Sequence, residues 1–508
     1  MSPELAPNRM GRIFGKTATP LPHTTEQGGI SATLLTWGTR LLLAYFGLRL
    51  VFFACTVSPF APPDEVTHAG VCTVFSRLFL LPDNSPATYE FGLVTNIPWL
   101  YYWIMGKLLH LNFFGISDLL FLRLLNIPLA FGTIRYLLRL LGLVTDDRLT
   151  RLLLVVVMTN TAMFSLLSAS VSYDNLTNLL AAMAIYYLFA FFKERSGDRL
   201  AASILCQLAG CLTKITFLPL VLMLALLLLL HELKNLPTLP AAMAGYFRRA
   251  DGRTWLSLLI IIMGLGLNLQ LYGGNYLRHG SLNPSMHEIL SPEIAMQYRL
   301  EARGLIFNRY REGKINYMEA LGLAGEIKHP GDKSDTFYLL MNYENLKRNP
   351  ELWLRPLPYA RVWFQTVVAT IFGIKAHLPL YKEERYLYPL YLLLGGATLG
   401  FALRWRPRES GWLPLYLAGS ALLYAGYLLV QVNYDNYLNY GVPGVTLQGR
   451  YLFPVIGPVY VLFCCYLLRL FRSDRIRVAL ALTTAILFIS YDFPWFLAHA
   501  TPAWYSQS

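Results

Sequence analysis

The fold is decided near the N-terminus, where residues 34–57 read LLTWGTRLLLAYFGLRLVFFACTV and residues 58–68 continue as SPFAPPDEVTH. A helix of about 20 apolar residues is long enough to cross a bilayer, so the first stretch predicts a membrane span. Two prolines end that helix, and Asp64, Glu65 and His68 follow them. On a helix, residues three and four apart share a face, so the three side chains form a candidate reaction centre at a membrane boundary.

Composition extends this interpretation to the whole chain. The sequence has 508 residues, 55% of them hydrophobic and only 14% charged, whereas soluble domains carry about 25% charged residues. Because apolar runs recur from residue 34 to the C-terminus, we expect an all-α polytopic membrane protein. The formal net charge is +13, but the basic residues lie mainly in short loops, where they set membrane topology. No basic stripe with interleaved aromatic residues indicates a nucleic-acid partner.

The cysteines and the N-terminal residues argue against a disulfide-bonded or zinc-binding protein and against a cleaved signal peptide. No CxxC spacing occurs among the six cysteines, and five of them lie in apolar runs, so neither a disulfide framework nor a zinc site is expected. Residues 1–33 are polar and rich in Pro, Thr and Gly, which predicts a disordered cytoplasmic tail. No small-residue cleavage site follows a short apolar core, so this tail is not interpreted as a signal peptide.

The apolar runs predict about eleven transmembrane helices. They cover residues 34–57, 118–140, 152–170, 175–192, two spans within 200–230, 255–272, 386–403, 411–431, 451–470 and 476–491. Residues 97–112 are aromatic and short, and treating them as a span would move the following basic loops outside. The positive-inside bias therefore favours a helix lying in the outer interface there, with the N-terminus cytoplasmic and the C-terminus external.

This topology predicts four parts. A transmembrane module at 34–272, with an external loop at 58–117, follows the tail at 1–33. An external or interfacial helical region then covers 273–384, and C-terminal transmembrane helices cover 385–508. Within the third part, residues 357–375 are apolar but include Arg361, so we interpret them as interfacial or re-entrant.

Polar residues from distant parts of the chain collect at the outer end of these spans. The candidates are Asp64, Glu65, His68, Arg123, Asp174, Lys214, Arg450 and Tyr451. Ionisable groups at span ends facing a cavity often mark functional sites. Arg450 lies outside against the positive-inside bias, beside Gly449, and an arginine there can bind phosphate through two hydrogen bonds.

Each candidate also has an ordinary structural explanation. Acidic residues after proline are how many helices start, which could account for Asp64 and Glu65. His68 could be a packing histidine, Asp174 could cap a helix, and Arg123 and Lys214 could extend to the lipid headgroups.

As an ordered set, these motifs resemble the GT-C glycosyltransferases, and within them the bacterial membrane proteins of the domain-of-unknown-function 2142 family. The resemblance covers roughly residues 35–490 and rests on five motifs. They are Pro63-Asp64-Glu65 with His68, Ser172-Tyr173-Asp174-Asn175, Leu212-Thr213-Lys214, Phe372-Gly373 and Gln448-Gly449-Arg450-Tyr451-Leu452-Phe453-Pro454. The chain departs from the family at Tyr173, where proline is more usual before the acid.

The resemblance implies a GT-C-like bundle in the cytoplasmic membrane of a bacterium and inverting transfer of a sugar at its outer face. The donor would be a polyprenyl-phosphate sugar, and the acceptor a glycan or lipid of the cell envelope. Asp64 matches the position of the catalytic base, with Glu65 and His68 supporting it. Arg450, and behind it Lys214 and Arg123, would meet the donor phosphate.

Several alternatives remain open at this point. Mg²⁺ or Mn²⁺ could bind between Asp64, Glu65 and Asp174, since carboxylates suit these ions, but the spacing does not require a cofactor. A transporter or flippase of lipid-linked saccharides is the main competing function. Transporters tend to carry charges near the bilayer midplane on broken, repeated helices, which this sequence does not show. A non-catalytic scaffold, or a ligase of preassembled glycans, would use a similar external face.

Overall fold

The computed structural model describes residues 31–85, 88–238, 248, 250–328, 330–375, 378–445 and 447–506. In these residues every regular element is helical, and strand-like pairing is limited to two isolated bridges, Val57 with Tyr505 and Ile374 with Leu380. This confirms the all-α class. The predicted cytoplasmic tail at 1–33 lies outside the described residues, apart from its last three.

Eight helical segments of the described chain are long and apolar enough to cross a membrane, as expected for a multi-pass membrane protein. Three are single helices: α1 (Ala32–Thr56), α4 (Asp118–Gly142) and α7 (Tyr173–Glu194). Three join two helices: α11 (Gly252–Asn268) with α12 (Gly274–His279), α21 (Leu413–Tyr427) with α22 (Asp435–Tyr440), and α24 (Asp474–Tyr491) with α25 (Phe493–His499). Two, α19 (Tyr388–Arg404) and α23 (Phe453–Arg469), are each preceded by a 3₁₀ turn.

A ninth span exists if a bent pair of helices is counted as one. These helices are α5 (Arg148–Thr159) and α6 (Ala162–Ser168), which meet at 68°. The predicted count of about eleven is therefore too high for the described chain. The difference lies in α8 (Gly197–Cys211) and α9 (Phe217–Glu232), which have 15 and 16 residues. At 1.5 Å per residue, 16 residues reach about 24 Å, less than the roughly 30 Å of a bilayer core.

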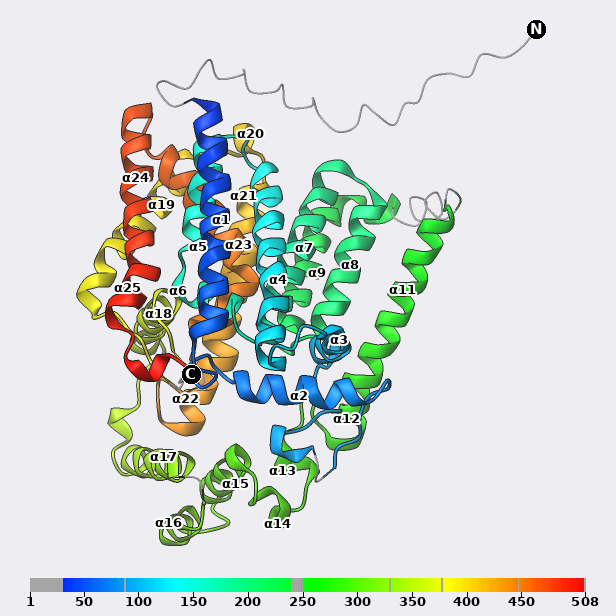
Figure 1. Ribbon diagram of the computed structural model, residues 1–508, viewed down its shortest axis with the longest axis vertical. Coiled ribbons are helices and arrows are strands. Elements are labelled where there is room, and N and C mark those ends of the chain that lie inside the picture. The colour runs from blue at the N-terminus through cyan, green and yellow to red at the C-terminus, as the bar shows by residue number, and fades with distance from the viewer. Residues whose placement is uncertain are drawn as a thin grey trace.

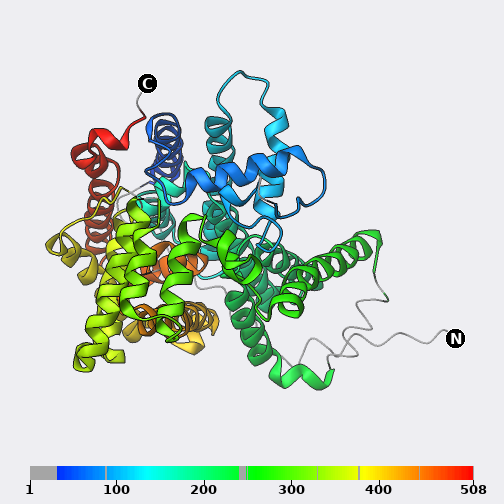
Figure 2. The ribbon, with the colours of Figure 1, turned by 90° about the horizontal axis from the view of Figure 1, so that it is seen from below.

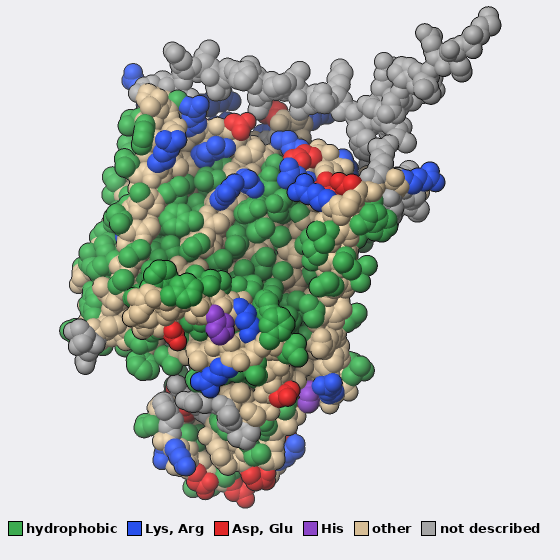
Figure 3. Space-filling model, turned by 45° about the vertical axis from the view of Figure 1, so that its right-hand side comes forward, with side chains coloured by type: hydrophobic (Ala, Val, Ile, Leu, Met, Phe, Trp, Pro, Cys, Tyr) green, Lys and Arg blue, Asp and Glu red, His purple; other side chains and the backbone are tan. Residues whose placement is uncertain are grey.

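Successive spans alternate in direction, so their connections gather at two ends of the bundle (Figure 1). The basic face holds the connections at 143–147, 195–196 and 470–473. The opposite end of the bundle carries the connection between α1 and the helix α2 (Glu65–Arg77), and we call it the site face. There α2 and α3 (Leu100–Leu108) lie against the end of the bundle. Between the two ends, Figure 3 shows a broad hydrophobic band, as expected of a surface that contacts lipid. With nine residues, α3 is too short to span, which agrees with the interfacial prediction for 97–112.

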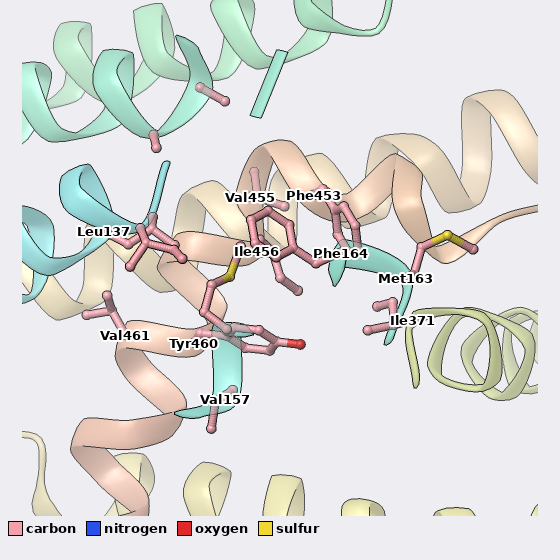
Figure 4. Close-up of a cluster of buried hydrophobic side chains, with 14 of the residues drawn as sticks. Leu137, Val157, Met163, Phe164, Ile371, Phe453, Val455, Ile456, Tyr460 and Val461 are labelled. Atoms are coloured by element: carbon pink, nitrogen blue, oxygen red, sulfur yellow. The ribbon is translucent and has the colours of Figure 1, made fainter. Parts of the chain in front are cut away.

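The helix α23 forms the centre of the bundle, and almost all of its side chains are buried. Figure 4 shows Phe453, Ile456 and Tyr460 of this helix packed among Phe164 of α6 and Leu137 of α4. An all-round apolar helix must be covered by neighbours, and α4, α5, α7, α19, α21 and α24 all pack on it. By contrast, α11 lies at the edge of the molecule in Figure 2 and exposes most of its apolar residues.

A small helical region lies below the site face in Figure 1. It contains α13 (Met286–Ile289), α14 (Pro292–Ala295), α15 (Arg299–Arg311), α16 (Tyr317–Gly325) and α17 (Pro330–Arg348). Asn316 and Glu319 form a capping box that starts α16, and Ile306, Phe307 and Leu340 form a separate core. The predicted start of this region at residue 273 is too early. A π-helical turn, Leu269–Gly273, carries the preceding span on to His279.

The chain then returns to the bundle through α18 (Pro356–Phe372). This helix covers most of the segment at 357–375 that the sequence predicts to be interfacial or re-entrant, and it is not among the candidate spans of the described residues. Its last turns pack on the 3₁₀ turn that precedes α23 and carries Arg450.

Candidate active site

Asp64 ends the connection between α1 and α2 in a left-handed backbone conformation, with φ of 60° and ψ of 14°. This region costs most residues about 1 kcal/mol or more, although aspartate tolerates it better than most. Asp64 occupies the N-cap position of α2, yet its side chain makes no capping hydrogen bond. Its carboxylate accepts a hydrogen bond from Nη2 of Arg450 at 2.9 Å, and 49% of the side chain is exposed. Helix capping therefore does not account for the presence of an aspartate at this position.

Arg450 links this exposed carboxylate to buried charges. It lies in the 3₁₀ turn Gly449–Leu452 before α23, and only 3% of its side chain is exposed. Its Nη1 lies 3.4 Å from Oδ2 of Asp174, in the first turn of α7, and Oδ1 of Asp174 accepts from Nζ of Lys214. Lys214 comes from the turn between α8 and α9. We call the series Lys214–Asp174–Arg450–Asp64 the charge chain. Its charges balance, as buried ions require.

Close packing and a cap fix two members of the charge chain. A Cβ at Gly449 would lie 2.6 Å from the carbonyl oxygen of Val367 in α18, so only glycine lets the turn approach that helix. The amide of Gly449 donates to Oγ1 of Thr370 at 2.7 Å, which holds the neighbouring Arg450 in place. The side chain of Ser172, not that of Asp174, caps α7. The carboxylate of Asp174 is therefore available to the two cations.

Aromatic rings enclose the charge chain. Nζ of Lys214 lies 4.7 Å from the ring centre of Tyr173 and 5.1 Å from that of Tyr451. The ring of His68 packs edge-on against Tyr173, and its Nδ1 lies 2.8 Å from the hydroxyl of Tyr102. Burial lowers the pKa of His68 to about 4, so its ring is neutral at pH 7. Its Nε2 is buried and has no partner among the described residues, which leaves a hydrogen-bonding group at the site.

Glu65 and Arg123 form a second, separate ion pair. Nε and Nη2 of Arg123 donate to the two oxygens of Glu65 at 2.9 and 2.5 Å, and the amide of Val171 donates to Oε1. Nη1 of Arg123 donates to the carbonyl oxygens of Ala54 and Val57 at the end of α1. Burial raises the pKa of Glu65, and Arg123 opposes this rise. The pair fastens the start of α2 to α1 and α4, and it thereby positions the adjacent Asp64.

The donor set does not fit the divalent cation that the sequence left open. Both oxygens of Glu65 are occupied by Arg123, and both oxygens of Asp174 by Lys214 and Arg450. Among the described residues, no group of three or more histidines, cysteines and carboxylates is placed to hold a metal ion. We therefore derive no catalytic step through a metal.

A further buried pair, absent from the sequence prediction, lies close to the site face. Nη1 of Arg49 in α1 contacts Oδ2 of Asp492, at the bend between α24 and α25, at 2.6 Å. Ser165 of α6 donates to the same Asp492 oxygen at 2.8 Å. Arg49 falls inside the first apolar stretch, and an ionisable residue within a span was the sequence signal that could have identified this pair.

Comparison with known proteins adds little to these observations. No family model matches the chain, so the resemblance to the domain-of-unknown-function 2142 family is not confirmed. No curated protein matches it either. Among solved structures, the chain is similar to the crystal structure of ArnT from Cupriavidus metallidurans in the apo state, with 11% identity and a TM-score of 0.35, covering 85% of this chain and 78% of that chain. Both values are low, so this similarity indicates neither an activity nor the site residues of the chain.

Proposed function

We propose that the protein is a GT-C-type membrane glycosyltransferase that moves a sugar from a polyprenyl-phosphate donor to a glycan or lipid acceptor of the cell envelope. The observation that carries this proposal is the half-exposed carboxylate of Asp64 bound to the buried guanidinium of Arg450. The pair places a proton acceptor next to a phosphate-binding cation at the end of a membrane bundle. A lipid phosphate would lie at the same level as this pair, at the bilayer surface.

The reaction needs one base and one anion-binding group. The carboxylate of Asp64 takes the proton of the acceptor hydroxyl, whose oxygen attacks the anomeric carbon of the donor sugar. The bond between that carbon and the phosphate oxygen breaks, and the electron pair leaves with the phosphate. Arg450 then binds the negative charge of the departing lipid phosphate, which is where charge develops. A single displacement of this kind inverts the anomeric configuration.

Donor binding would also free the base. Arg450 has two faces, with Nη1 toward Asp174 and Nη2 toward Asp64. A phosphate oxygen that takes over the Nη2 contact releases the carboxylate of Asp64 toward the acceptor, while Asp174 still holds the guanidinium. In this scheme Lys214 keeps Asp174 in place, and the Glu65–Arg123 pair is a positioning element rather than a second base.

Substitution of the base tests the proposal directly. In the purified protein supplied with polyprenyl-phosphate sugars and an envelope glycan acceptor, Asp64→Asn should lower the transfer rate by about 10²-fold or more. The melting temperature should fall only modestly, because Asp64 is half exposed and Arg450 keeps its contact with Asp174. Asp83→Asn, an exposed carboxylate on the same face, is the matched control and should keep full activity. Full transfer by Asp64→Asn would remove Asp64 as the base.

A further inference from the structure

A cavity of about 660 Å³ lies near the basic face, at the opposite end of the bundle from the charge chain. One face of α4 lines it, with Phe131, Ile134, Arg135, Leu138, Arg139 and Gly142 at positions i, i+3, i+4, i+7, i+8 and i+11. Leu43 of α1, Arg151 of α5 and Tyr186 of α7 complete the walls, with Leu143 and Asp146 in the connection after α4. Four elements therefore meet around this space.

Apolar and basic side chains both line the cavity along α4. Phe131 and Ile134 lie deepest, and Arg135, Leu138 and Arg139 follow toward Gly142. From Phe131 to Gly142 the helix advances eleven residues, which is about 16 Å along its axis. The cavity thus extends from the connection after α4 into the hydrophobic band, a depth that matches a lipid headgroup with the first part of its acyl chains.

The charges around the cavity do not balance. Three arginines line it, Arg135, Arg139 and Arg151, against the single carboxylate of Asp146. None of the three arginines is in an ion pair within the part of the chain that the structure describes. The guanidinium of Arg139 rests over the ring of Tyr136 at 5.1 Å and lies 6.0 Å from that of Tyr186, which directs it along the helix surface.

We infer that this cavity binds an anionic phospholipid, with the phosphate between Arg135, Arg139 and Arg151 and the acyl chains along Leu43, Phe131 and Leu138. Basic pockets between transmembrane helices bind anionic headgroups, and arginine holds phosphate through paired hydrogen bonds. A glycerol headgroup suits the mouth best, since its hydroxyls can donate to Asp146. A free phosphate would leave the apolar depth of the cavity empty. The site is independent of the proposed transferase, whose charge chain lies at the other face.

Lipid binding can be measured without any enzyme assay. The full-length protein in neutral detergent is titrated with phosphatidylglycerol, phosphatidylcholine or glycerol phosphate, and bound lipid is counted by native mass spectrometry while the melting temperature is recorded. We expect phosphatidylglycerol to remain bound and to raise the melting temperature, and the other two to do neither. Arg135→Gln with Arg139→Gln should weaken phosphatidylglycerol binding by about tenfold or more, because each basic side chain near an anionic lipid contributes roughly fivefold.

Two further variants separate lost binding from lost folding. Gly142→Leu fills the mouth of the cavity, where a Cβ would meet only Nη2 of Arg151 at 3.6 Å, and it should block the lipid while leaving the charges in place. Arg472→Gln changes an exposed arginine on the basic face outside the cavity and should bind lipid normally. Equal retention of phosphatidylcholine, equal stabilisation by glycerol phosphate, or normal lipid binding by the cavity variants would overturn the inference.

Discussion

The left-handed backbone at Asp64 stores strain at the residue that we propose as the base. Such conformations persist only where the surroundings enforce them, and they cluster at functional sites. Here the preceding prolines and the neighbouring Glu65–Arg123 pair fix the backbone on both sides. In this conformation the carboxylate binds Arg450 and does not cap the helix that it precedes.

Replacing Asp64 with glycine should therefore separate stability from function. Asp64→Gly removes the backbone strain, which is worth about 1 kcal/mol. It also removes the half-exposed partner of the buried Arg450, whose other contact, with Asp174, stays in place. We expect the free energy of unfolding in detergent to fall by less than the roughly 3–5 kcal/mol that the loss of a fully buried partner costs, while sugar transfer is abolished. Arg195→Gly is the matched control, because Arg195 is the other described non-glycine residue with positive φ, at 57° on the basic face. A loss of stability far above that of the control would show that the Arg450 contact serves folding.

Sequence reasoning could name the residues of the site but not their partners. Asp64 and Glu65 are adjacent, and the pattern suggested a joint role for both carboxylates. Asp64 has a left-handed backbone whereas Glu65 begins the helix, and the two side chains diverge. One carboxylate meets Arg450 and the other meets Arg123. The sequence spacing does not show which arginine binds each carboxylate, because the pairing depends on how α4 and α23 pack in the bundle.

At the scale of elements, the pair formed by Arg49 and Asp492 joins α1 to the bend between α24 and α25. We expect Arg49→Met or Asp492→Leu alone to lower the free energy of unfolding by about 3–5 kcal/mol, since each leaves a buried charge without its partner. The double substitution should recover most of that loss. Equilibrium unfolding in detergent provides the measurement.

The exposed pair of Arg199 with Glu194 is the control for this experiment, and Glu194→Gln should cost no more than about 1 kcal/mol. Equal small losses in both pairs would contradict a structural role for the buried one. Losses that simply add in the double variant would show that Arg49 and Asp492 do not interact.

Hydropathy predicted where the helices lie in the sequence, but it did not predict their lengths. The two spans predicted within 200–230 are helical and a turn separates them, but they have only 15 and 16 residues, fewer than a bilayer core requires. Similarly, the span predicted to end at 272 continues to His279 through a π-helical turn. Hydropathy measures where apolar residues occur, and a turn or a π-helical insertion changes the length of a helix without changing that pattern.

For the molecule as a whole, alternation of the spans requires the two faces to lie on opposite sides of the membrane. We expect a cysteine introduced by Asp83→Cys to react with an impermeant maleimide on intact cells. One introduced by Arg253→Cys should react only after permeabilisation. Both positions are exposed, and the background should carry Cys55→Ser because the other native cysteines are buried. Labelling of both on the same side would refute the predicted orientation.

The positive-inside bias predicted which ends of the spans lie together, and Figure 1 shows the same two groups of connections. The sequence also predicted a helical region within 273–384, but neither the packing of its core nor the central position of α23. Both depend on contacts between residues far apart in the chain, such as Phe307 with Tyr440, and no local pattern encodes them.

The separation of Arg450 from Asp64 by 386 residues has a consequence for biosynthesis. A ribosome releases Asp64 into the membrane long before it synthesises the cation that Asp64 binds. Until α23 inserts, the nascent chain carries Asp174 with only half of its partners, and the centre of the bundle is empty. The proposed catalytic centre is thus completed among the last steps of translation, and a chain interrupted before residue 449 should enter the membrane yet show no transferase activity.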